Sequence, residues 1–125
     1  MSIQFYKVMH LIGMLMVFFP LGGLLVYSAN GGLKKNNVWR AKTAATHGLG
    51  LLLSLVGGFG MIAKLQGVGF PAWAWIKLAI WLALGGVTVM IAKKPELAKV
   101  LWLVILALGF IAITLGIYHV EWFGQ

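Results

Sequence analysis

The chain has 125 residues, of which 62% are hydrophobic and 10% are charged, and it contains no cysteine. Soluble domains carry about 25% charged residues, so this composition indicates an integral membrane protein with room for one domain. The absence of cysteine excludes disulfides, iron–sulfur clusters, thiolate-ligated haem and covalently attached haem. Glu96 and Glu121 are the only acidic residues, which excludes a carboxylate-rich metal site and a two-carboxylate hydrolase.

Four long hydrophobic runs follow one another along the chain. We predict helices over residues 4–29, 43–64, 71–92 and 96–120, because about 20 helical residues cross the hydrocarbon core and the backbone there must bond to itself. Turn-forming residues separate the runs at 30–32, 67–71 and 93–96. The expected fold class is all-α, an integral membrane four-helix bundle formed by a single transmembrane domain, residues 1–125.

The net charge of +8 comes mostly from short loops between the runs, which suits anionic membrane lipid better than nucleic acid. Two loop cations, Lys7 and Lys64, lie on one side; the other side carries seven, namely Lys34, Lys35, Arg40, Lys42, Lys93, Lys94 and Lys99. The positive-inside rule then places the first and third loops in the cytoplasm. We therefore expect a multi-pass protein of the bacterial cell inner membrane with both termini outside, in the periplasm. The first run exceeds the roughly 7–15 apolar residues of a signal peptide, so we expect it to remain as a span.

Each run also carries one ionisable side chain near an end: His10, His47, Lys77 and His119. Polar groups are costly in hydrocarbon and tend to face the bundle interior and mark sites. The predicted topology places His47 toward the cytoplasmic leaflet and the other three toward the outer leaflet. His10 is the strongest candidate, since it lies about 10 Å into its helix. Lys77 has a plainer interpretation as a snorkelling lysine, and His119 as an anchor at the headgroups. Aromatic residues near run ends fit an interfacial belt: Trp39, Trp73, Trp75, Trp122 and Phe123.

Small residues accompany the histidines at helical spacing, where residues three or four apart share a face. Gly13 lies one turn from His10, and two longer stripes read Thr43, His47, Gly50, Ser54, Gly57, Met61 and Ile105, Gly109, Ala112, Gly116, His119. Such stripes allow close helix packing in lipid. Beside a histidine, they also leave room for a flat ligand such as a porphyrin.

Imidazole in a membrane bundle favours b-type haem or a related porphyrin as the cofactor. His10 would be an axial ligand, and His47 or His119 would be a second ligand or serve another site. Lys77 would hold propionates or relay a proton. These three histidines are the candidate metal ligands, but their different depths disfavour zinc. Copper held by His10 and neighbouring methionines is a further alternative, carried by Met9, Met14 and Met16, although methionine is often a packing residue.

Two short motifs resemble a known superfamily. The stretch from Lys7 to Gly13, followed by Gly22 and Gly23, is similar to the opening helix of small bacterial four-helix membrane proteins that include the oxygen-independent protoporphyrinogen IX oxidase family and copper-resistance D-type domains. The stretch 75–78 (Trp-Ile-Lys-Leu) also resembles the oxidase family. The resemblance implies a catalytic pair, His10 and Lys77.

Taken together, these patterns predict a haem- or porphyrin-binding membrane protein, with porphyrinogen oxidation and quinone as electron acceptor as the oxidoreductase interpretation. One alternative is a non-catalytic accessory or assembly subunit of a homo-oligomer or larger membrane complex. The other is a copper-handling membrane protein.

Overall fold

The computed structural model describes residues 1–65 and 69–123, apart from the side chains of Trp122 and Phe123, so these two members of the expected aromatic belt and part of the second break lie outside it. Four long helices follow one another: α1 (Ile3–Ala29), α2 (Arg40–Ala63), α3 (Ala72–Lys93) and α4 (Ala98–Phe123). Short 3₁₀ helices precede α2 (η1, Lys34–Asn36) and α4 (η2, Pro95–Leu97). The all-α four-helix prediction is confirmed.

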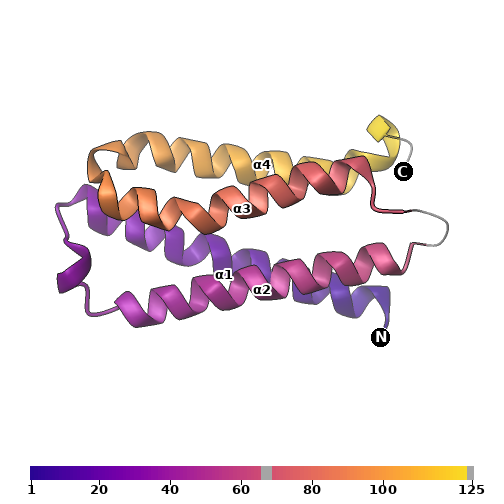
Figure 1. The fold of residues 1–125 in the computed structure, drawn as a ribbon, viewed down its shortest axis with the longest axis horizontal. Helices are drawn as coiled ribbons and strands as arrows, with labels where there is room; N and C mark the ends of the chain where they lie inside the picture. The colour runs from indigo at the N-terminus through magenta and orange to yellow at the C-terminus, as the bar shows by residue number, and fades with distance from the viewer. Residues whose placement is uncertain (66–68, 124–125) are drawn as a thin grey trace.

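Each helix runs antiparallel to the one before it in the chain, so both termini lie at one end of the bundle (Figure 1). Compared with the predicted ranges, α2 begins three residues earlier, at Arg40, and α4 ends three residues later, at Phe123. The fourth α-helix begins two residues later than predicted, at Ala98, because residues 95–97 form a separate 3₁₀ turn with Pro95 at its first position. The short connections at Lys34–Asn36 and Pro95–Leu97 lie at the opposite end from the termini.

Helices α1 and α2 form the closest pair, and glycine makes that approach possible. A Cβ atom on Gly57 would lie 2.6 Å from the His10 backbone nitrogen, and one on Gly50 would lie 2.7 Å from Met16 Cβ. A Cβ atom on Gly13 would collide with the Ser54 backbone. Gly13, Gly50 and Gly57 therefore serve the close packing of α1 against α2, which is a main source of attraction between helices in lipid.

The apolar core joins α1 to α3 and α4. Val17, Leu21 and Leu25 of α1 are almost completely buried against Leu84 of α3 and Ile105 of α4, among others. Helix α1 therefore contacts all three other helices, while α2 is attached mainly through α1.

Helices α2 and α3 have few contacts and are joined by two hydrogen bonds near mid-bundle. His47 Nε2 donates to the Leu84 carbonyl oxygen at 3.1 Å, and Trp81 Nε1 donates to the Leu51 carbonyl oxygen at 2.9 Å. Carbonyl oxygens only accept, which fixes the direction of both bonds. These bonds divide the space between α2 and α3 into two cavities, one toward each end of the bundle.

The outer surfaces of the helices are apolar. Large hydrophobic side chains remain exposed along every helix, including Phe19, Leu52, Leu82 and Phe110. All four helices are long and apolar enough to cross a membrane. Since a soluble bundle would place such residues inside, this surface defines the chain as a membrane protein whose solvent is lipid.

Candidate functional site

One cavity, of about 290 Å³, opens between the helix pairs toward the termini. Its lining contains three of the four predicted residues, His10 from α1, Lys77 from α3 and His119 from α4. We call it the histidine–lysine cavity. Most of the remaining lining is aliphatic and aromatic, so the polar groups face a space of low polarity.

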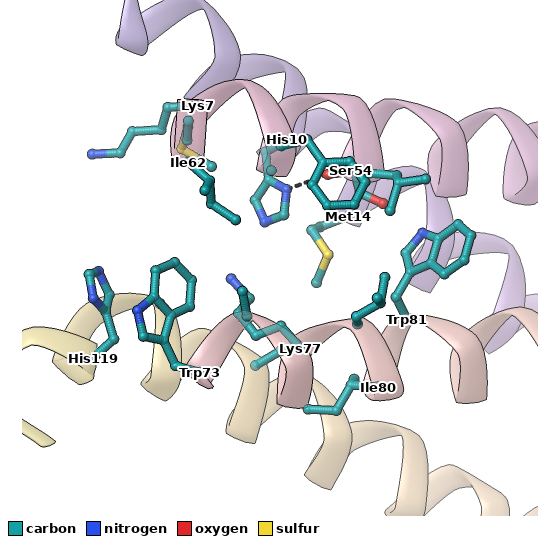
Figure 2. A pocket seen from close by; sticks show the side chains of 18 of the residues that line it. Lys7, His10, Met14, Ser54, Ile62, Trp73, Lys77, Ile80, Trp81 and His119 are labelled. Carbon is teal, nitrogen blue, oxygen red and sulfur yellow. Dashed lines mark hydrogen bonds between the residues drawn. The ribbon is translucent and has the colours of Figure 1, made fainter. Parts of the chain in front are cut away.

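The His10 ring is held in one orientation by the neighbouring helix. Its Nδ1 donates to the Ser54 carbonyl oxygen of α2 at 2.7 Å, as Figure 2 shows. A neutral imidazole with hydrogen on Nδ1 carries its lone pair on Nε2, and the ring projects into the cavity. Gly58 lies beside this ring: a Cβ atom added to Gly58 would be 3.4 Å from His10 Nδ1. An imidazole fixed in this way can bind a metal or accept a proton through Nε2.

Lys77 faces His10 from the opposite wall. Figure 2 shows its side chain extending from α3 across the cavity toward the imidazole. Gly116 of α4 provides the room, because a Cβ atom at that position would lie 3.3 Å from the Lys77 Nζ. The ammonium group is therefore directed into the cavity and is not simply spread along the surface. It can hold an anionic oxygen of a ligand or transfer a proton.

Trp73 and His119 form the wall nearest the termini. Their rings are stacked, with centroids 4.2 Å apart and an interplanar angle of 28°. Trp73 is only 7% exposed, and its Nε1 is the one buried side-chain nitrogen or oxygen without a hydrogen-bond partner among the described residues. The belt position expected for Trp73 is therefore wrong, since its ring lies inside the bundle. His119 is half-buried and lines the cavity through this stacked ring.

Two predicted site residues lie elsewhere. His47 lies in the second cavity, is 5% exposed and binds the Leu84 carbonyl, so it is separated from His10 by the bridge between α2 and α3. Gly13 packs against the backbone of α2 and does not line the cavity among its described residues. The described part of the chain contains no cluster of three His, Cys, Asp or Glu side chains able to hold a metal ion.

Sequence reasoning missed three contributors to the site. Ser54 matters through its backbone carbonyl, which no sequence pattern reveals. The sequence did not distinguish the role of Gly58 from that of Gly57, because only the rotation of α2 about its axis decides which glycine faces α1 and which faces the cavity. The pairing of Trp73 with His119 joins residues of α3 and α4, which are far apart in the sequence.

The chain matches no protein-family model, no curated protein and no solved structure.

Proposed function

We propose that this chain is a membrane protein that binds a porphyrin, as b-type haem or a related tetrapyrrole, in the histidine–lysine cavity. The observation that carries the proposal is the His10 ring, whose Nδ1 is bonded to a backbone carbonyl while the rest of the ring projects into an apolar cavity. Ligating histidines usually donate their other ring N–H to a carbonyl or carboxylate, which orients the ring and raises its basicity.

Lys77 and the aromatic wall support the same ligand. The Lys77 ammonium suits a propionate, and the stacked rings of Trp73 and His119 offer a flat apolar surface. The cavity volume of about 290 Å³ is just below the roughly 300–1,000 Å³ typical of ligand sites. A tetrapyrrole would therefore extend from the cavity between α2 and α3, which have few contacts with each other.

The chemistry that follows is oxidation and reduction. A bound haem would supply one-electron transfer. If the ligand is instead a porphyrinogen substrate, the lone pair of His10 Nε2 would take up a released proton and the Lys77 ammonium would hold a propionate. A membrane quinone would accept the electrons and protons as it becomes quinol. The proposed location is a bacterial inner membrane, with the termini and the histidine–lysine cavity on the periplasmic side, because the opposite end carries seven loop cations.

The first test is an absorption spectrum of the purified protein before and after reconstitution with haemin. We expect a Soret band, a reduction of at least about tenfold in haemin affinity for His10→Ala, and no change for His47→Ala. The second variant is the matched control, since it also removes a buried imidazole from the same bundle. A protein without haem or porphyrin absorbance after reconstitution, or an unchanged His10→Ala, would contradict the proposal.

A copper-handling role is the second candidate, because the Met14 thioether lies in the same cavity as His10 (Figure 2). Thioether and imidazole ligands suit Cu(I). Copper retained by the purified protein and lost in Met14→Leu, with no porphyrin absorbance, would favour this role over the first. An accessory-subunit role would be favoured if neither ligand binds and the chain co-purifies with a larger complex.

A further inference from the structure

A second cavity, of about 410 Å³, lies at the end of the bundle opposite the termini. Lys34, Arg40 and Asn37 line its mouth, and Leu24 and Ile91 line its apolar part. We call it the basic cavity. It plays no part in the proposed porphyrin site, because the bonds from His47 and Trp81 lie between the two cavities.

The connection that carries the two cations is folded back onto α1. Gly31 has φ of +84°, which a residue with a side chain rarely adopts, and Gly32 lies directly against the Tyr27 ring. Tyr27 Oη then donates to the Leu33 carbonyl oxygen at 2.8 Å. Lys34 follows immediately, so its backbone position is set by these contacts.

Hydrogen bonds also fix the chain at the N-terminus of α2. The Trp39 amide donates to Asn37 Oδ1 at 3.0 Å, and the Arg40 amide donates to the Asn37 carbonyl oxygen at 3.1 Å. Arg40 therefore begins α2 and, like Lys34, lines the cavity. The site has a formed rim and does not depend on a loop closing over a ligand.

Charge and polarity define the occupant. None of the described lining residues is acidic, and Lys34 and Arg40 supply two positive charges. The lining also includes apolar side chains, among which Ile91 is buried and Val89 is exposed on the outer surface of the bundle. Its remaining polar groups are neutral hydroxyls and one buried imidazole: Tyr27, Ser28, Thr43, Thr88 and His47. The ligand should therefore combine an anion at the rim with a hydrocarbon segment below it. Guanidinium and ammonium groups bind phosphate well, and this end of the bundle faces the leaflet that is rich in anionic lipid if the positive-inside rule holds.

We propose that the basic cavity binds the phosphate headgroup of an anionic phospholipid at Lys34 and Arg40, with part of an acyl chain against Leu24 and Val89. A free phosphate ion shares the headgroup chemistry. The apolar lining favours the lipid, because an inorganic ion would leave that surface without a partner.

The test uses the delipidated full-length protein in detergent and native mass spectrometry. Phosphatidylglycerol and phosphatidylcholine of the same chain length are titrated separately, and inorganic phosphate is added as a competitor. The test variant is Lys34→Ala/Arg40→Ala. The matched control is Lys35→Ala/Lys93→Ala, which removes the same charge from the same end of the bundle at exposed residues that do not line the cavity among those described.

We expect the wild-type chain to bind phosphatidylglycerol at least about tenfold more tightly than phosphatidylcholine. The Lys34/Arg40 variant should lose this preference, while the control variant keeps it and both retain wild-type helicity. Equal binding of the two lipids by the wild type overturns the proposal whether or not the variants fold. Equal losses in both double variants would reduce the effect to general surface charge, and full displacement by millimolar inorganic phosphate would assign the site to a free anion.

Discussion

At the scale of single residues, the two ionisable groups that face each other in the membrane have different kinds of support. His10 is fixed by a hydrogen bond from its ring to the Ser54 carbonyl. Lys77 has space, provided by Gly116, and a direction toward His10. A lysine so placed in hydrocarbon is costly unless its ammonium group reaches water or an anion. Substitution of Lys77 therefore distinguishes an ammonium that only reaches water at the membrane surface from one that binds an anionic ligand.

Lys77→Met should lower the affinity for porphyrin by about tenfold or more while the protein stays folded, because a propionate loses its cation. Lys77→Arg should restore binding only in part, since the planar guanidinium is larger than the ammonium for which Gly116 leaves room. Haemin titration followed at the Soret band measures both. Lys64→Met is the control, because Lys64 is an exposed cation near the same end and not in the described lining. Affinities unchanged in Lys77→Met would return this residue to a snorkelling role.

At the scale of helices, the pairing of α1 with α2 decides the site. Their glycine-mediated approach brings the Ser54 carbonyl to His10 and leaves α2 apart from α3, so that cavities remain between them. The glycines therefore support the site indirectly: Gly50 and Gly57 bring helices together, while Gly58 and Gly116 leave space for the His10 and Lys77 side chains.

Gly57→Ala should destabilise the bundle by about 1–3 kcal/mol, because the added methyl group meets the His10 backbone and must push α1 away from α2. It should also weaken porphyrin binding through displacement of the His10 ring. Gly22→Ala is the control, since an added Cβ at that position meets no atom of another helix within 4 Å. Unfolding in a titration with SDS, followed by circular dichroism, compares the two. Equal stability of both variants would mean that α1 and α2 do not pack as closely as described.

At the scale of the whole molecule, charge and polarity are distributed unequally between the two ends. The end with the termini carries Lys7 and Lys64 and opens into the histidine–lysine cavity, and the other end carries the basic loops. If the basic end lies in the cytoplasm, the proposed porphyrin site and the proposed lipid site face opposite leaflets. Access to the first would then be from the periplasmic side.

Cysteines placed singly at Asn36 and Gly69 should be labelled from opposite sides of the membrane, because one spanning helix, α2, lies between the first connection and the second. A membrane-impermeant maleimide added to intact cells should react with Gly69→Cys, and with Asn36→Cys only after the cells are opened. Both positions lie outside the long helices, so access reflects sidedness. Labelling of both from outside would contradict the four-span topology.

The sequence alone determined the membrane class, the four helices and the identity of the polar candidates. These follow from local physics: a run of about 20 apolar residues must be helical in lipid. An ionisable group in such a run has a high free energy of transfer into hydrocarbon, which singles it out as a candidate. Helix rotation and pairing are not local, since apolar faces of α1 to α4 look alike when lipid and core are equally hydrophobic. Only the tertiary structure decided that His10 and Lys77 share a cavity with His119, because that depends on which glycines meet across α1 and α2. The tertiary structure also decided that His47 bonds to the Leu84 carbonyl and that the Trp73 ring lies inside the bundle. A histidine or tryptophan in an apolar run can bond to a backbone carbonyl or face a cavity, and the position of the neighbouring helix determines which of the two occurs.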